Sequence, residues 1–291
     1  MSIHVQKSFG GQHEVGTLYL VGTPIGNLED MTFRAVRTLK EADLIAAEDT
    51  RQTRKLLTHY DIQTRLVSYH EHNKQASGPE LIRLLQEGKS IALVSDAGLP
   101  AISDPGADLV ALAAAEAIPV VPVPGANAAL SALIVSGLST ERFAFVGFPP
   151  RDKKPLGEWL DHCGKLEETI ILYESPHRLG RTLSAMLEAW GDRRIAMVRE
   201  LTKRHEEVAR GMISECLARL EEHPPLGEYC LVVEGRKPGS GEGAEDAWWA
   251  QLDLEAHVSY YEATYGRKEA IKKVANDRGV PKRDVYNAVN R

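Results

Sequence analysis

A stretch of small and acidic residues at 95–106 has the composition of a loop that binds a ligand. Glycines and prolines in it separate two carboxylates, Asp96 and Asp104, which can accept hydrogen bonds from ammonium or hydroxyl groups. Such residues build tight turns that a ligand can approach. The apolar residues at 91–94 are typical of a strand buried on both faces, and Asp104-Pro105 is a suitable cap and first residue for an alanine-rich helix over 107–117. Because ligands of open α/β sheets bind at the carboxyl ends of parallel strands, the stretch predicts a ligand site there.

Groups able to move a proton follow two strands that we expect in the second half of the chain. Glu174 and His177 follow an apolar strand, and so do Glu200 and Lys203. Histidine titrates near neutrality, whereas a lysine acts as a base only where desolvation removes its proton. A helix cap or an ion pair remains the alternative role for each of the four.

The elements that must position these groups alternate between strand and helix. The expected strands of the first half lie at 18–21, 44–47, 66–69, 91–94 and 119–123, and the expected helices at 33–40, 52–59, 79–87, 107–117 and 128–135. The prolines of 119–123 favour an edge position for that strand. The alternation predicts a mostly parallel sheet covered on both faces. A second unit has expected strands at 143–148, 169–173, 195–198 and 229–233, with helices ending at 190 and 222.

Composition limits the class of protein. The chain has 291 residues, 43% of them apolar and 26% charged, which favours two globular domains. Its three cysteines form no paired or metal-binding pattern, so we expect reduced thiols, no metal and a cytoplasmic location. No apolar run reaches the length of a membrane span. Residues 1–15 lack the apolar core of a signal peptide and are expected to form a loose extension.

The end of the chain differs from the rest in charge. The net charge is −6, yet residues 266–291 hold eight Lys or Arg against three Asp or Glu. A flexible linker is expected at 237–246, followed by a small helical appendage over 247–291. The basic segment is either a surface that binds a polyanion or a solvated helix face.

Five short motifs together carry a resemblance to a known family. They are GTPIGNL at 22–28, AEDTR at 47–51, the loop at 95–106, PGANA at 124–128 and LYESPHR at 172–178. In order and spacing they resemble the tetrapyrrole-methylase superfamily of class III S-adenosylmethionine (SAM) enzymes, and within it the bacterial 16S ribosomal RNA cytidine 2′-O-ribose methyltransferases. The resemblance covers about residues 16–236 and, more weakly, 266–270. Most tetrapyrrole enzymes of the superfamily have Gly-Asp-Pro where this chain has Ser95-Asp96-Ala97, a departure that favours the ribosomal RNA branch.

The resemblance implies two α/β domains, at 16–138 and 139–236, a SAM molecule in the cleft between them, and a homodimer. It also implies which residues contact SAM: Pro24, Asp96, Gly98, Leu99, Pro100, Asn127 and Ala128 of the first domain, and Leu172, Tyr173, Leu201 and Thr202 of the second. The acceptor side is less defined, and Glu174, His177, Glu200 and Lys203 are the candidate catalytic residues because a ribose hydroxyl needs a base or a hydrogen-bond acceptor.

RNA contact is expected from side chains that can bind phosphate. The candidates are Arg51, Arg178, Arg267, Lys268, Lys272, Lys273, Lys282 and Arg283. The activity implied is SAM-dependent 2′-O-methylation of a cytidine of 16S rRNA near the decoding centre, in the assembled 30S subunit. Two alternatives remain. One is methylation of a tetrapyrrole ring carbon, which needs no basic tail. The other is a non-catalytic RNA-binding or ribosome-binding factor that has lost cofactor affinity.

Overall fold

The computed structural model describes residues 5–6, 15–237, 249 and 252–289. The chain divides into two compact units, one made of 1–164 and 168–234 and the other of 165–167 and 235–291. The expected N-terminal extension at 1–15 and linker at 237–246 lie almost wholly outside the described residues.

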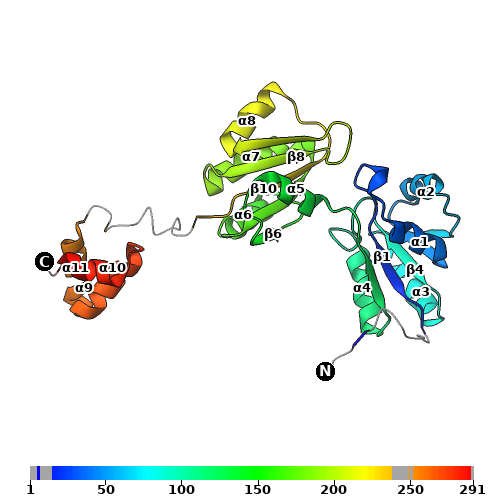
Figure 1. Ribbon diagram of the computed structural model, residues 1–291, viewed down its shortest axis with the longest axis horizontal. Coiled ribbons are helices and arrows are strands. Elements are labelled where there is room, and N and C mark those ends of the chain that lie inside the picture. The colour runs from blue at the N-terminus through cyan, green and yellow to red at the C-terminus, as the bar shows by residue number, and fades with distance from the viewer. Residues whose placement is uncertain (1–4, 7–14, 238–248, 250–251, 290–291) are drawn as a thin grey trace. The chain divides into compact units, whose positions relative to one another are not determined.

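The first sheet of the larger unit has five strands in the order β3-β2-β4-β1-β5, and every pairing in it is parallel (Figure 1). The strands are β1 (Leu18–Val21), β2 (Leu44–Ala47), β3 (Leu66–Ser68), β4 (Ile91–Val94) and β5 (Val120–Val123). All four residues of β4 are buried, as the apolar run predicts. The parallel sheet and the edge position of β5 are both confirmed.

Helices cover both faces of this sheet, as expected. They are α1 (Phe33–Glu41), α2 (Thr50–His59), α3 (Lys74–Gln86) and α4 (Gly106–Ala115), preceded by a short 3-10 turn at Leu28–Asp30. Residues of α1 and α2 share one core cluster with the strands, and residues of α3 and α4 share another. Side-chain caps explain where two of these helices begin. Thr32 accepts a hydrogen bond from Ala35 N–H at the start of α1, and Asp49 accepts one from Arg51 N–H at the start of α2.

Two helix boundaries differ from the expected ones. Helix α3 begins at Lys74 rather than at 79 and contains Pro79. Within this early part of the helix, Gly78 is buried and lies close to Leu112 of α4. Helix α4 begins at Gly106, so Pro105 is the residue before the helix and Asp104 is not its cap residue.

The second sheet is mixed, with the order β6-β7-β10-β8-β9. Its elements are β6 (Phe143–Phe145), α6 (Lys153–Cys163), β7 (Thr169–Glu174), α7 (Pro176–Trp190), β8 (Arg194–Arg199), β9 (Glu207–Met212), α8 (Ile213–Glu222) and β10 (Tyr229–Val233). Strands β7 and β8 both run antiparallel to β10. They therefore run in the same direction and end at the same edge of the sheet.

Helix α5 (Ala128–Ser136) precedes the expected domain boundary at 138 but packs on the second sheet. Its Ala129, Ala132 and Leu133 share a core cluster with Ile171, Val198 and Val232. The connection from the first sheet thus crosses to the second at the Pro124-Gly125 turn, before α5 begins.

The described part of the smaller unit holds three helices, α9 (Leu254–Tyr265), α10 (Arg267–Asp277) and α11 (Lys282–Val289). They share an apolar core centred on Val258, Ile271 and Val274. Four residues separate α10 from α11, and Gly279 among them has a φ of +62°. The helical appendage is therefore observed over its described part, 252–289.

The three cysteines are buried free thiols in three different elements, Cys163 in α6, Cys216 in α8 and Cys230 in β10. Burial raises the pKa of each, to about 11 for Cys216 and about 12 for Cys230. Across the described ranges, no helix combines the length and the apolarity that crossing a bilayer requires.

Candidate active site

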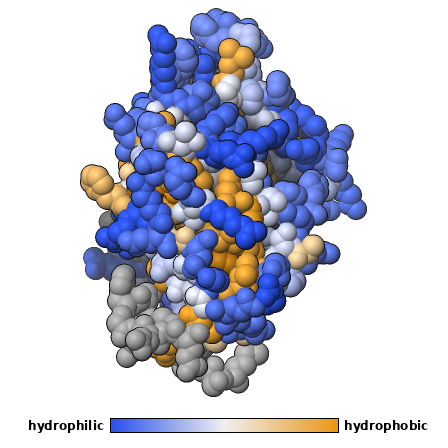
Figure 2. Space-filling model, turned by 90° about the vertical axis from the view of Figure 1, so that its right-hand side faces the viewer, coloured by the Kyte–Doolittle hydropathy of each residue, from blue (hydrophilic) through white to orange (hydrophobic). Residues whose placement is uncertain are grey.

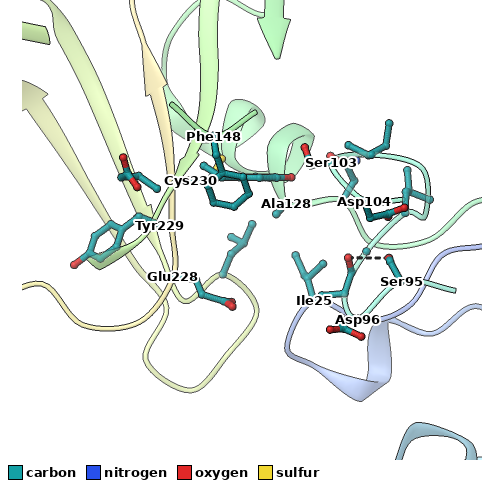
Figure 3. Close-up of a pocket in the computed structure, with 18 of the residues that line it drawn as sticks. Ile25, Ser95, Asp96, Ser103, Asp104, Ala128, Phe148, Glu228, Tyr229 and Cys230 are labelled. Atoms are coloured by element: carbon teal, nitrogen blue, oxygen red, sulfur yellow. Dashed lines mark hydrogen bonds between the residues drawn. The ribbon is translucent and has the colours of Figure 1, made fainter. Parts of the chain in front are cut away.

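A cavity of about 480 Å³ lies in the larger unit between the ends of the two sheets. The loops that follow β1, β2, β4 and β5 form one wall, and the ends of β7 and β8 with the start of β10 form the other (Figure 3). Its volume is in the range of sites that bind a small molecule. The strand ends thus place the cavity where the sequence predicts a ligand site.

Three turns of the first wall pack backbone against backbone. Thr23 and Gly98 form an isolated bridge, with N–H···O distances of 2.9 and 3.1 Å in the two directions. A Cβ added to Gly22 would lie 2.8 Å from the Cα of Gly125. Since no side chain fits between these turns, glycine at 22 and 125 is required for the close packing that shapes the first wall.

The loop between β4 and α4 contains strained backbone at the cavity. Ala101 and Ser103 have φ of +69° and +62°, which residues other than glycine rarely adopt. The carboxylate of Asp104 stabilises this loop, because its Oδ1 accepts from Ala101 N–H at 2.9 Å and from Gly106 N–H at 2.7 Å. Strain of this kind is concentrated at functional sites.

Carboxylates are grouped on the first wall. Glu48, Asp96 and Asp104 all line the cavity. Burial raises the pKa of Glu48, and the negative charges of Asp96 and Asp104 raise it further. Burial also raises the pKa of Asp104. The first wall therefore favours a positively charged ligand group.

The second wall is largely apolar. Tyr173, Leu201 and Cys230 line it, and burial raises the pKa of the Tyr173 hydroxyl to about 12. The ring of Phe148 lies 5.5 Å from that of Tyr173, centroid to centroid, and stays 55% exposed. In Figure 3 its side chain extends into the space that faces the first wall. This wall presents flat and apolar surfaces to a ligand.

Glu174 is buried at the edge of the same wall. Its Oε1 accepts from Ser175 N–H at 2.7 Å and its Oε2 from the Thr182 hydroxyl at 2.6 Å. Arg178 lies 3.5 Å from Oε2 and donates to the carbonyls of Pro149 and Pro150 at 2.7 and 3.0 Å. Glu174 thereby fixes, through Arg178, the loop that carries Phe148.

Lys203 lines the cavity between two carboxylates, with its Nζ 3.0 Å from Glu200 and 2.8 Å from Glu228. Burial lowers the pKa of this ammonium, but the hydrogen bonds to Glu228 and Glu200 outweigh it, and the pKa is raised. A hydrogen bond from Glu228 N–H and the ammonium of Lys203 lower the pKa of Glu200. In this arrangement Lys203 stays a cation, so the condition for its use as a base is not met.

The cavity brings together nine of the residues named from the sequence for the cofactor and for catalysis. They are Asp96, Gly98, Leu99, Asn127, Ala128, Tyr173, Glu174, Leu201 and Lys203. Six others are not among the residues that line it, namely Pro24, Pro100, Leu172, His177, Glu200 and Thr202. Leu172 is fully buried because alternation along β7 points it to the face opposite Tyr173, and His177 is exposed on α7.

The candidate RNA-binding side chains differ in how far they are already paired. Arg51 is 88% exposed but makes a two-point contact with Asp49, and Arg178 is engaged with carbonyls as described. Arg267 and Lys272 pair with Glu262 and Glu269, and Lys273 lies 4.4 Å above the ring of Tyr265. Three are exposed and make no ion pair or hydrogen bond with any described residue: Lys268, Lys282 and Arg283.

Several residues of the cavity were not singled out from the sequence as a site. These are Ile25, Glu48, Ile102, Ser103, Phe148, Ser175, Pro176, Val198, Glu228, Tyr229 and Cys230. Glu48 could have been found, because it directly follows the buried strand β2. Glu228 precedes β10 and Tyr229 begins it, and only the antiparallel direction of this strand brings that end to the cavity. Within the described ranges, no group of three or more His, Cys, Asp or Glu could hold a metal ion.

A family model described as Tetrapyrrole (Corrin/Porphyrin) Methylases matches residues 17–217. The chain belongs to this tetrapyrrole methylase family. Proteins named ribosomal RNA small subunit methyltransferase I, from Halalkalibacterium halodurans and Bacillus subtilis, are each 57% identical to this tetrapyrrole methylase, with 97% of both chains covered. A protein of the same name from Synechocystis is 46% identical over 94% of this chain and 96% of its own.

Solved structures share the fold of this tetrapyrrole methylase. A uroporphyrin-III C-methyltransferase from Thermus thermophilus, in complex with S-adenyl homocysteine, has a TM-score of 0.54 and 21% identity, covering 75% of this chain and 97% of its own. A diphthine synthase has a TM-score of 0.59 and 14% identity, covering 75% and 90%. At such identities the likeness shows the two-sheet architecture, which the sequence resemblance also implies.

Proposed function

We propose that this tetrapyrrole methylase uses SAM to methylate the ribose 2′-hydroxyl of a cytidine in 16S ribosomal RNA, near the decoding centre of the assembled small subunit. The observation that carries the proposal is the 57% identity, over 97% of both chains, to relatives named ribosomal RNA small subunit methyltransferase I. We place the protein in the cytoplasm, where such a substrate is made.

The residues of the cavity fit SAM. When bound, SAM supplies a methyl group on a positively charged sulfur. The Oδ2 of Asp104 is buried and has no hydrogen-bond partner among the described residues, so it is available to an ammonium or hydroxyl donor. The close packing of Gly22 against Gly125 leaves no room for a Cβ, and it holds together the turns that carry Ile25 and Asn127 at the cavity. The apolar second wall suits a flat adenosine group.

The charge of the cavity favours a neutral acceptor over a tetrapyrrole. Five carboxylate residues line it (Glu48, Asp96, Asp104, Glu174 and Glu228), against one ammonium, that of Lys203. Precursors of the tetrapyrroles carry several carboxylates, which this cavity would repel. A ribose hydroxyl is uncharged. The phosphates beside it would remain outside the cavity, so their affinity has to come from another surface.

The smaller unit offers such a surface. Lys282 and Arg283 begin α11, and Lys268 lies in the first turn of α10. All three are exposed and, among the described residues, without a partner. We propose that they bind RNA phosphates, which adds affinity that does not depend on sequence and that falls with salt. We also propose a homodimer, since Leu130 and Ile134 of α5 are apolar and exposed and a second copy could cover them.

The direct test maps 2′-O-methyl groups on 16S rRNA from cells with and without the gene, followed by transfer of labelled methyl groups to 30S subunits by the purified protein. Loss of one cytidine modification in the deletion strain, restored in vitro, is the expected result. Unchanged modification would refute the proposal.

Two variants separate the remaining functions. Asp96→Ala should abolish binding of S-adenosylhomocysteine (SAH) in a calorimetric titration while the protein stays folded. A wild-type protein that binds RNA but not SAH would instead be a non-catalytic RNA-binding factor. Replacing Lys268, Lys282 and Arg283 together by Gln should lower the salt slope of RNA binding by about 2, at roughly 0.7 per single-strand phosphate contact, and an unchanged slope would exclude these contacts.

A further inference from the structure

The proposed reaction needs a group that takes the proton of the ribose hydroxyl, and most candidates in the cavity already have partners. Lys203 is held as a cation between Glu200 and Glu228. Glu174 accepts hydrogen bonds from Ser175 and Thr182. These groups are committed to fixing the second wall, and none of them is an unoccupied base.

On the first wall, two carboxylates accept hydrogen bonds from backbone N–H groups. Asp96 accepts from Asp49 N–H at 2.9 Å. Asp104 closes the loop that precedes α4 through two N–H groups, and its second oxygen is buried. Both line the cavity, and the second oxygen of Asp104 has no hydrogen-bond partner among the described residues. These carboxylates are therefore suited to bind the cofactor.

Glu48 differs from both. It is partly buried, lines the cavity, and its carboxylate makes no hydrogen bond or ion pair with any described residue. It follows β2, which pairs with β4 in the register Ala47↔Val94. Glu48 is therefore about one strand spacing, ~4.8 Å, outward from the loop that follows β4. It lines the cavity on the β2 side of Asp96 and Asp104, the two carboxylates assigned to the cofactor.

The charges around Glu48 suit a base. The groups that face it on the first wall are Asp96, Asp104 and Asp49, all acidic, and with burial they raise its pKa above the ordinary value of a glutamate. Across the cavity lie Glu174, Glu228 and the paired Lys203. No described cation pairs with the carboxylate of Glu48. Groups whose environments raise the pKa in this way are typical of acid–base sites.

We propose that Glu48 is the general base that accepts the proton of the acceptor ribose hydroxyl; this rests on the proposed function. As the hydroxyl oxygen forms its bond to the methyl carbon, the carbon–sulfur bond breaks and its electron pair goes to sulfur. The hydroxyl proton passes to the Glu48 carboxylate. The methylated ribose and neutral SAH result, and Glu48 returns its proton to water before the next turnover.

The test compares Glu48→Gln with the wild type on 30S subunits under single-turnover conditions, with SAH affinity measured by calorimetry as a second readout. Removing a general base should lower the rate constant about 10²- to 10⁴-fold. SAH affinity should change by less than about fivefold, because the cofactor is assigned to Asp96 and Asp104. Glu48→Asp, which keeps a carboxylate on a shorter stem, should retain part of the rate.

The dependence of the rate on pH supplies a readout that a structural role would not move. The wild-type rate should fall as the pH drops through the pKa of Glu48, and this acidic limb should be absent in Glu48→Gln. Glu41→Gln, which removes the same charge from an exposed position at the end of α1, is the matched control and should match the wild type.

Two results would overturn the assignment. One is a Glu48→Gln rate within threefold of the wild type. The other is a loss of rate matched by an equal loss of SAH affinity, which would make Glu48 a cofactor ligand. If the wild type itself fails to methylate 30S subunits, the proposed function fails instead.

Discussion

The buried carboxylate of Glu174 allows a prediction that separates a structural role from a catalytic one. Its side chain is fully buried, and it accepts hydrogen bonds from Ser175 and Thr182 and pairs with Arg178. In Glu174→Gln one oxygen acceptor remains, but the charge is lost. Hydrogen bonds to a charged group contribute about 1.5–3 kcal/mol each, against about 0.5–1.5 for neutral ones, so two bonds lose about 2 kcal/mol in total.

The ion pair with Arg178, whose side chain is 23% exposed, adds roughly 1 kcal/mol, the upper end for a solvent-screened pair. The free energy of unfolding should therefore fall by about 3 kcal/mol, and the melting temperature by about 6–12 °C for a unit of this size. Thermal unfolding followed by circular dichroism measures the change, and Glu188→Gln on the exposed side of α7 is the control that should stay within about 0.5 kcal/mol.

A melting temperature of Glu174→Gln within 1 °C of that control would refute the structural role of Glu174. An unchanged melting temperature with a rate constant reduced 100-fold would show instead that Glu174 acts on the substrate. We expect the reverse. The melting temperature of Glu174→Gln should fall clearly, and its rate constant should fall less, because the loop that carries Phe148 becomes looser.

Three further predictions concern the cavity. Gly22→Ala should weaken SAH binding in a calorimetric titration at least tenfold, because its Cβ would lie 2.8 Å from the Cα of Gly125 and the turns must separate. Unchanged affinity would mean that the close packing of these two turns does not matter for the cofactor. Phe148→Ala should raise the KM for 30S subunits about 5- to 100-fold, the effect of losing one base stacked on an aromatic ring, while SAH affinity stays constant; a loss of SAH affinity would place the ring against the cofactor. SAH affinity should fall as the pH drops through the raised pKa of Asp104, since only the ionised carboxylate attracts the ammonium group of the ligand. Calorimetric titrations between pH 4.5 and 8 measure this change, and an affinity that does not fall would exclude the contact.

Periodicity and turn residues were sufficient to predict the first sheet. Apolar runs of only four residues, such as 44–47 and 91–94, each followed by polar turn residues, are too short for typical helices and favour buried parallel strands. The second sheet was harder, because β9 reads EVARGM, in which charged residues and a glycine interrupt the apolar pattern. Its pairing with β8 over six residues stabilises an edge strand that local sequence does not favour.

Site residues in motifs at strand ends could be predicted from the sequence. Those whose position depends on the direction of a strand or on a tertiary contact could not. Asp96 and Tyr173 are motif residues and do line the cavity. Glu200, also at a strand end, turns toward Lys203 and the N–H of Glu228 instead, in a loop where its φ is +50°. The contact with Glu228 joins residues 28 positions apart, and no local pattern encodes it.

The alkylation rates of the three cysteine thiols report how often the elements that bury them open. Thiolate is the reactive form, and burial keeps each cysteine protonated at neutral pH. An alkylating reagent should therefore modify each thiol at a rate set by how often the helix or strand that carries it opens to solvent. Cys230 differs from the others because it lines the cavity. With SAH bound in the cavity, Cys230 should be alkylated more slowly, while the alkylation rates of Cys163 and Cys216 stay the same. Mass spectrometry of the unmodified natural chain could thus follow occupancy and unfolding in one sample.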